Sequence, residues 1–337
     1  MAEEFSEKKI RDLFSGFDKL KVVILGDIML DKYIYGNSDR MSPEAPVPVV
    51  DVTGKESKAG GAANVAMNIR SLGATPYLFS IIGGDESGEE LLAIINDQSI
   101  DTDNILHDGS RITTTKTRVI AKGKHVIRYD SEQTNDIDES MQEDLCHSLI
   151  DFLSTEKIDI VIIEDYNKGL LTVSLIKSVI DVCNKNNIPV AVDPKKKNFF
   201  AYKNCYLFKP NLREIKESLK IDFDPGNINK LNEIADSLQA QMPHNFTMIT
   251  LGDKGIYTRY KNISIKKEAH QRNIIDVSGA GDTVISVAAL CIASGANAEL
   301  TTEISNIAGG LVCEYSGVVP VDHLQLLDEV IRLRNSK

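Results

Sequence analysis

A glycine-rich turn followed by an acidic residue stands out at residues 275–283, which read IDVSGAGDT. The run after it, residues 284–294, is small and apolar enough to form a buried helix. The first turn of that helix would consist of Gly279, Ala280, Gly281 and Asp282. Backbone N–H groups there lack intrahelical partners and lie at the positive end of the helix dipole, so the turn predicts a site for phosphate oxygens.

Asp282 adds a second chemical property to this turn. A carboxylate beside a bound phosphate repels the anion unless it has another task, and accepting a proton from an attacking hydroxyl group is a suitable one. The alternative is structural: Ser278 caps the helix, and Asp282 is simply favoured near its positive end. The spacing of this turn alone leaves both interpretations open.

Composition limits the class of partner. The chain has 337 residues, of which 42% are hydrophobic, which is enough for a large core. Its formal net charge of −11 argues against a nucleic-acid partner or an anionic membrane, so a small molecule is expected. The 5 cysteines show no CxxC spacing, and neither a disulfide framework nor a zinc site is indicated.

The first twenty residues predict an amphipathic helix and not a signal peptide. They are rich in charge and place apolar side chains at helical spacing, namely Ile10, Leu13, Phe14, Phe17 and Leu20. No apolar run approaches transmembrane length. We therefore expect a cytoplasmic protein.

The chain predicts an α/β fold with a mostly parallel central sheet and helices on both faces. Residues 21–27 (KVVILGD) are typical of a strand buried on both faces, and strands and helices alternate after residue 136. The further strands expected are 77–82, 158–163, 189–193, 205–208, 246–251, 256–260 and 263–268. The helices expected are 64–72, 87–97, 172–186, 211–219 and 300–315, the last capped at 301–303. We expect one domain over residues 1–337, because no low-complexity linker interrupts it.

Two strand-rich inserts, at about residues 33–58 and 112–130, predict a small β-sheet lid over the site. Prolines in the first insert confine its strands to an edge or a separate sheet, and the second turns near Gly123. Lys116, Arg118 and Arg128 could line the inner face of this lid and pair with an anionic substrate, although solvated charges are the common case. Small sheets with Val-rich faces seldom stand alone in water, so we expect a homodimer through the lids.

Polar groups follow several predicted strands at their carboxyl ends, where ligands collect in such sheets. Asp27 and Asp31 follow the first strand, and each could bind a ligand hydroxyl group or cap a loop. The glycines Gly60 and Gly61 would let a ligand approach the backbone beside Asn64, whose amide suits sugar hydroxyl groups.

Three motifs occur in order: GGAAN at 60–64, NLRE at 211–214 and DVSGAGDT at 276–283. With them, the chain resembles the ribokinase-like sugar kinases, also called the PfkB family, over nearly all of its length. The resemblance implies a ribokinase-like fold, ATP and Mg²⁺ as cofactors, and a monovalent cation as a further candidate. It also implies that Asp282 is the catalytic base and that Gly279, Ala280 and Gly281 form the anion hole.

The resemblance to the family implies roles for further positions, inside and outside these three motifs. Matching the family pattern, Asn211 and Glu214 organise magnesium and phosphate, with Glu214 reaching the ion through water, as hydrated Mg²⁺ prefers. Thr250, Gly252 and Gly255 match the nucleotide-binding segment, and Asn306 lies where the family closes over adenine. Sugar-binding positions are matched by Asp31, Gly60, Gly61 and Asn64.

A narrower resemblance rests on GDIMLD at 26–31, SPEAPVP at 42–48, DYNKG at 165–169 and DPK at 193–195. These segments look like those of the D-glycero-β-D-manno-heptose-7-phosphate kinases, which occur alone or fused to an adenylyltransferase domain. The substrate would be a sugar phosphate, and its own phosphate would need cations. The candidates are Lys168, Lys195, Arg118 and Arg128. The sequence lacks an HxGH motif, so adenylylation is expected from a separate adenylyltransferase acting downstream.

Three alternatives are weighed against this hypothesis. A related kinase acting on another sugar phosphate or a nucleoside would keep Asp282 as the base. A nucleotide-binding oxidoreductase would need a GxGxxG turn after the first strand, and residues 23–27 read VILGD instead. A catalytically silent scaffold on the same fold would not need both Asp282 and Glu214.

Overall fold

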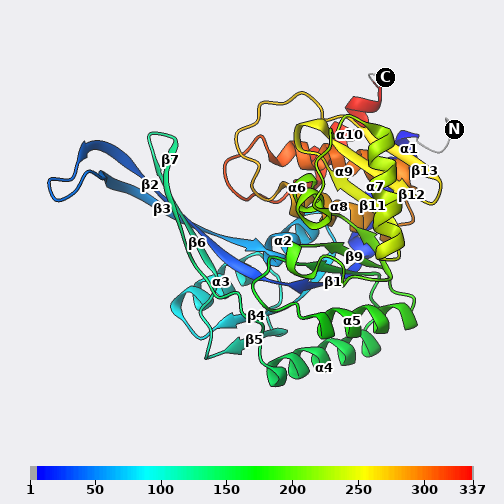
Figure 1. Cartoon of the computed structure of the whole chain (residues 1–337), viewed down its shortest axis with the longest axis horizontal. Helices are drawn as coiled ribbons and strands as arrows, with labels where there is room; N and C mark the ends of the chain where they lie inside the picture. Colours follow the sequence, from blue (N-terminus) through cyan, green and yellow to red (C-terminus); the bar gives the residue numbers. More distant parts are fainter. Residues whose placement is uncertain (1–5, 336–337) are drawn as a thin grey trace.

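A nine-stranded sheet forms the body of the protein, and a four-stranded sheet projects from it (Figure 1). The computed structural model describes residues 6–335. The order of the larger sheet is β13-β12-β11-β10-β9-β8-β1-β4-β5, with β12 and β13 antiparallel and the other strands parallel. Its strands are β1 (Lys21–Gly26), β4 (Thr75–Gly83), β5 (Ile105–Asp108), β8 (Ile160–Glu164), β9 (Val190–Asp193), β10 (Cys205–Phe208), β11 (His244–Thr250), β12 (Ile256–Tyr260) and β13 (Ile263–Lys267).

The helices cover both faces of this sheet. One layer consists of α1 (Glu7–Ser15), α2 (Ala62–Ser71), α3 (Glu86–Asp97), α8 (Ala280–Ala293), α9 (Ala298–Val312) and α10 (His323–Asn335). The opposite layer consists of α4 (Glu139–Thr155), α5 (Val173–Lys185), α6 (Leu212–Leu219) and α7 (Ile228–Gln241). Along β1 the buried side chains alternate between the layers, Val22 and Ile24 on one side, Val23 and Leu25 on the other. This explains why the strand is a continuous apolar run.

The smaller sheet, which we call the lid, has the order β3-β2-β6-β7. Its strands are β2 (Ile28–Met41), β3 (Pro48–Gly61), β6 (Thr115–Ala121) and β7 (Lys124–Ser131). The turn between β6 and β7 places Lys122 and Gly123 at positive φ, as a two-residue hairpin requires. Both strand-rich inserts therefore join one sheet, as the sequence predicts.

The lid is continuous with the body at Asp27 and Gly61. Asp27 is the single residue between β1 and β2, and β3 leads directly into α2. At these two crossings the chain passes between body and lid. A hydrogen bond connects them, in which Ala62 N–H donates to the Asp27 carbonyl, 3.0 Å away. Gly61 has φ of 64°, and a Cβ there would lie 2.3 Å from the same carbonyl oxygen. Only glycine lets the two crossings approach so closely.

The strand and helix alternation predicted from the sequence is confirmed, although strand β5 was not predicted and several helices also differ from the prediction. Helices α4, α7 and α10 were not predicted, and α9 begins at its cap Asn297 instead of at 301–303. The predicted N-terminal helix is shorter, ending at Ser15, and residues 1–5 of that prediction lie outside the described residues. Ile10, Phe14 and Phe17 are buried, as its apolar spacing implies.

The cysteines are free thiols, four of them buried. Within residues 6–335, every helix is too short or too polar to cross a membrane.

Candidate functional site

The N-terminus of α8 contains the glycine-rich turn. Its N-cap is Gly279 in a left-handed conformation, with φ of 78°, and a Cβ there would lie 2.9 Å from the side-chain nitrogen of Asn64. Ser278 instead donates its backbone N–H to the side chain of Asp276, 3.0 Å away. The alternative in which Ser278 caps this helix is therefore wrong. A glycine cap leaves the first-turn N–H groups available for an anion.

Asp282 lies in the first turn of α8 with only 4% of its surface exposed. One carboxylate oxygen accepts a hydrogen bond from Asn64 Nδ2 at 2.7 Å, and the other accepts one from the Tyr166 hydroxyl at 2.8 Å. Burial raises the pKa of Asp282 to about 6, against the effect of these two donors. The carboxyl group is thus oriented from two sides and titrates close to neutral pH, as a general base should.

Asn64 lies in the first turn of α2, separated from the two glycines of the GGAAN motif by two alanines. Its side chain is fully buried, and its oxygen accepts a hydrogen bond from Asn68 Nδ2 at 3.3 Å. A Cβ on Gly60 would lie 2.3 Å from a carboxylate oxygen of Asp31. Gly60 therefore leaves the space in which Asp31 reaches the site.

The ends of three neighbouring strands add charged groups beside Asp282. Glu164 ends β8, Asp193 ends β9 and Lys209 follows β10. The Lys209 ammonium is almost completely buried and lies 2.7 Å from Asp193. Lys195 lies 2.8 Å from Glu214 and 3.7 Å from Asp193.

The carboxylates of Glu164, Asp193 and Asp282 form a cluster that fits a divalent cation. One oxygen of each lies within 4.8 Å of the others, and oxygen donors are what Mg²⁺ prefers. Neither oxygen of Glu164 has a hydrogen-bond partner among residues 6–335. Burial, and next the Asp193 carboxylate, raise the pKa of Glu164 well above its usual range.

Glu214, the predicted magnesium residue, caps a helix. It forms a capping box with Asn211 at the start of α6, accepting the Asn211 N–H at 2.8 Å, and its other oxygen pairs with Lys195. Because both oxygens are engaged, its geometry suits contact with a metal through water better than direct contact.

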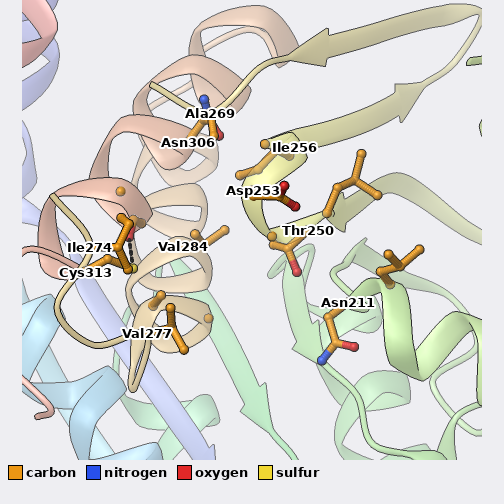
Figure 2. A pocket seen from close by; sticks show the side chains of 18 of the residues that line it. Asn211, Thr250, Asp253, Ile256, Ala269, Ile274, Val277, Val284, Asn306 and Cys313 are labelled. Atoms are coloured by element: carbon orange, nitrogen blue, oxygen red, sulfur yellow. Dashed lines mark hydrogen bonds between the residues drawn. The ribbon is translucent and has the colours of Figure 1, made fainter. Parts of the chain in front are cut away.

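A cavity of about 830 Å³ opens beside the N-terminus of α8 (Figure 2). The predicted nucleotide residues that line it are Asn211, Thr250, Gly252, Gly255 and Asn306, together with Ala280 and Gly281 of the glycine-rich turn. Glu214 lies outside the lining. Asn306 donates from its side chain to the carbonyl of Glu268, 2.9 Å away, which fixes the segment after β13 at the cavity wall.

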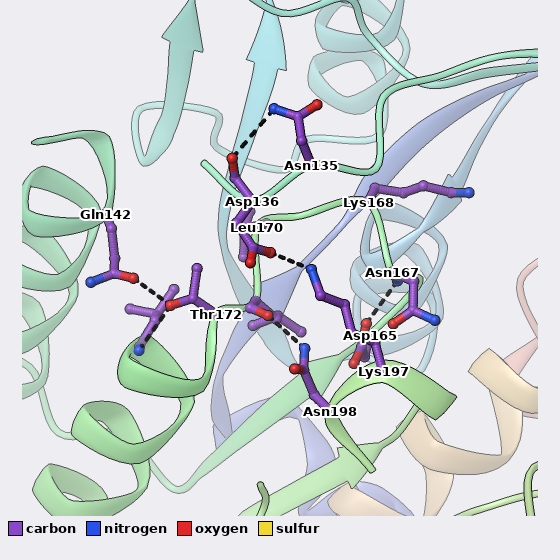
Figure 3. Close-up of polar contacts among 12 residues, drawn as sticks. Asn135, Asp136, Gln142, Asp165, Asn167, Lys168, Leu170, Thr172, Lys197 and Asn198 are labelled. Atoms are coloured by element: carbon purple, nitrogen blue, oxygen red, sulfur yellow. Dashed lines mark hydrogen bonds and ion pairs between the residues drawn. The ribbon is translucent and has the colours of Figure 1, made fainter. Parts of the chain in front are cut away.

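The segment after β8 is held by polar contacts, several of which are drawn in Figure 3. The Asp27 carboxylate accepts hydrogen bonds from the backbone N–H groups of Tyr166, Lys168 and Leu170 at 2.9, 3.1 and 3.3 Å. Asp27 therefore caps this loop, which is the structural role that the sequence left open for it. The Asp165 carboxylate accepts the Asn167 N–H at 2.7 Å. These bonds position the ring of Tyr166 against Asp282.

The four cations predicted to bind the substrate's own phosphate lie in different settings. Arg118 pairs with Asp31, and both are largely buried. Lys168 lies 2.7 Å from Glu132, and Lys195 pairs with Glu214. Arg128 is on β7, with 58% of its side chain exposed and Asp130 at 3.0 Å. Each of the four therefore has a carboxylate partner.

Sequence reasoning gave no role to Tyr166 or Lys209, although Tyr166 falls in the DYNKG segment at 165–169 and Lys209 lies two residues before the NLRE motif. A lysine directly after an apolar strand is a usable signal, since a buried ammonium group requires a carboxylate. Nothing local in the sequence indicates that Tyr166 contacts Asp282, which is 116 residues away.

Comparison with known proteins supports a single family. The family model described as pfkB family carbohydrate kinase matches residues 19–323. A bifunctional protein HldE from Aliarcobacter butzleri is 35% identical over 320 residues, covering 94% of this chain and 65% of the relative. Another from Helicobacter pylori is 34% identical, covering 94% and 66%. The chain thus spans about two thirds of the length of the curated relatives it matches.

Solved structures share the fold at low identity. Phosphofructokinase-2 from Escherichia coli in complex with potassium superposes with a TM-score of 0.78 at 19% identity, covering 94% of this chain and 99% of that one. Ribokinase of Arabidopsis thaliana complexed with ribose and ATP gives 0.71 at 16%, covering 92% and 98%. Because the family model matches residues 19–323, the chain belongs to the pfkB family of carbohydrate kinases.

Proposed function

We propose that this kinase uses ATP to phosphorylate the anomeric (C1) hydroxyl group of D-glycero-β-D-manno-heptose 7-phosphate, giving the 1,7-bisphosphate and ADP. The reaction would occur in the cytoplasm and supply ADP-heptose synthesis for the lipopolysaccharide core. The alternative is a ribokinase-like kinase of another sugar phosphate or a nucleoside.

The observation that carries the phosphoryl-transfer step is the setting of Asp282. Its carboxylate is held by Asn64 and Tyr166 at the end of a helix whose first turn also lines the large cavity. Asp282 would take the proton from the acceptor hydroxyl, while the N–H groups of residues 279–282 stabilise charge on the transferred phosphoryl group. Catalysis of phosphoryl transfer depends mainly on aligning the reacting groups and stabilising charge in this way.

The nucleotide would occupy the cavity of about 830 Å³, beside Asn211, Thr250, Gly252, Gly255 and Asn306. Mg²⁺, bound with the nucleotide, would supply neutralisation of the phosphate charge. Glu214 would hold it through water, and the cluster formed by Glu164, Asp193 and Asp282 offers carboxylate oxygens beside it. A monovalent cation is a further candidate activator.

The sugar would lie between Asp282 and the lid. Asp31 and Asn64 would bind its hydroxyl groups, and Gly60 and Gly61 would allow it to approach the backbone. Cations near the inner face of the lid would bind its phosphate.

The choice of heptose rests on the narrower resemblance in residues 26–31, 42–48, 165–169 and 193–195. Kinases of that type occur alone or fused to a second domain, which agrees with the bifunctional relatives.

We expect ADP release with heptose 7-phosphate at a kcat/KM at least tenfold above that for fructose 1-phosphate, tagatose 6-phosphate or a nucleoside. A coupled ADP-release assay on this panel provides the measurement. Turnover of a non-heptose substrate alone would overturn the heptose assignment and leave the kinase assignment intact.

Replacing Asp282 by asparagine should lower kcat by roughly 10² or more, because the general base is lost. ATP binding, measured by calorimetry, should stay nearly unchanged. Asp181→Asn, at an exposed position of α5, is the matched control and should turn over normally. Near-normal turnover of the Asp282→Asn enzyme contradicts the assignment of the base.

The rate should depend on pH through Asp282. A base whose pKa is raised to about 6 is protonated below that pH, so kcat/KM should fall as pH decreases through 6 and be constant above it. The hydrogen bond from Tyr166 lowers this pKa. The Tyr166→Phe enzyme should therefore lose activity at a higher pH than the wild type does.

The control for this profile is Tyr77→Phe, whose ring packs against Phe152. Its profile should match that of the wild type. An unchanged acid limb in the Tyr166→Phe enzyme would show that the Asp282 carboxylate does not set the pH dependence.

We also propose a homodimer through the lids. Exposed apolar side chains gather on lid strands, namely Met41, Val52, Val126, Ile127 and Tyr129. Light scattering at micromolar concentration should give twice the mass of the chain, and Ile127→Lys should shift it toward the monomer. Ile263→Lys, on β13, is the matched control because the two isoleucines are 56% and 55% exposed. A monomeric wild-type protein would rule the dimer out.

A further inference from the structure

Lys116 on β6 differs from the other cations around the site in having no carboxylate partner among residues 6–335. Among residues 6–335, no carboxylate lies within the 4.0 Å that defines an ion pair with its ammonium group. The side chain is half-buried, and burial lowers the pKa of its ammonium group. A partly desolvated cation without a counter-ion is costly, and a bound anion would remove that cost.

The strand register explains why Lys116 is left unpaired. Asp31 of β2 and Asp130 of β7 lie directly opposite Lys116 on its two neighbouring strands, so all three side chains share one face of the lid. Each of these carboxylates is already paired with an arginine, Asp31 with Arg118 and Asp130 with Arg128. The nearby Lys168 is likewise matched by Glu132. Lys116 is thus the excess positive charge on this face.

Lys116 also lies on the side of the site that contains the base. Its ammonium nitrogen is 5.1 Å from the centre of the Tyr166 ring, and the hydroxyl group of that ring donates to Asp282. Lys195 approaches the same ring, at 5.0 Å, but is paired with Glu214. A ligand with one end at Asp282 and an anionic group extending toward the lid would meet Lys116.

We propose that Lys116 binds the phosphate already present on the sugar and so makes this enzyme specific for phosphorylated over unphosphorylated sugars. This inference rests on the proposed function. The sequence already places Lys116 among the lid cations that could pair with an anionic substrate, and the structure assigns it, ahead of the four cations proposed for the phosphate, the main charge contact. The ligand class is a phosphomonoester dianion, and Lys116 supplies a charge-assisted hydrogen bond to it.

The test compares Lys116→Met with Lys124→Met. Methionine keeps the length of the side chain and removes the charge, and Lys124 is an exposed lysine on the neighbouring strand of the same sheet. With the phosphorylated sugar that the wild type uses best, Lys116→Met should raise KM about 10- to 100-fold, as expected for one charged hydrogen bond. KM for ATP should stay unchanged, and Lys124→Met should behave as the wild type.

Two further measurements separate binding from support of Tyr166. Calorimetry with the phosphorylated sugar alone should show the same loss of affinity in Lys116→Met, and Lys116→Arg should restore most of it. If Lys116 only supported the ring of Tyr166, Lys116→Met would lower kcat and leave KM unchanged, and the proposal would be overturned. An equal rise in KM for Lys124→Met would also overturn it, since general lid charge would then account for the effect.

The outcome is separable from that of the heptose assignment. If the wild type prefers another phosphorylated sugar, the heptose assignment fails and Lys116 is tested with that sugar. If the wild type accepts only unphosphorylated sugars, the Lys116 inference fails while membership of the kinase family stands.

Discussion

The arrangement of this protein depends on keeping one carboxylate, that of Asp282, buried and oriented. A buried carboxylate needs donors, and both of its donors come from distant parts of the chain, Asn64 being 218 residues away and Tyr166 116 residues away. Meeting this need requires α2, α8 and the segment after β8 to converge. The parallel order that places β8 beside β1 brings these segments to the same edge of the sheet.

The charge balance next to Asp282 explains why a metal ion suits this site. Four acidic side chains, Glu164, Asp193, Glu214 and Asp282, face two buried or half-buried lysines, Lys195 and Lys209. Even with Glu164 protonated, acidic groups outnumber the lysines. A nucleotide phosphate approaching this edge needs a cation as well as the N–H groups of α8, and carboxylate oxygens are suitable donors for one.

The sequence could predict what depends on local pattern. Apolar runs predicted the strands, and GGAAN, NLRE and SGAGDT predicted which residues lie at the cavity and around Asp282. It could not predict partners, because the pairing of Arg118 with Asp31 across 87 residues depends on the register of two strands. Helix α4 was missed because it buries a narrow stripe, Leu145, Leu149 and Leu153, within a polar sequence. The α9 cap was misplaced because threonine and asparagine are both capping residues, and only the extended backbone of Asn297 decides between them.

The way the lid joins the body divides the site into two halves. Asp282, Glu164 and Asp193 lie on α8, β8 and β9, which are packed between two layers of core side chains. Asp31 and Lys116 lie on β2 and β6, strands that continue outward into the projecting lid (Figure 1). Bending of the lid strands would therefore carry Asp31 and Lys116 toward or away from a base that stays fixed. The contacts that link the halves include Lys116 over the ring of Tyr166, the ion pair of Lys168 with Glu132 just beyond β7, and the bond from Lys58 of β3 to the Ser316 carbonyl. A substrate lying between Asp282 and the lid would add its own contacts to these.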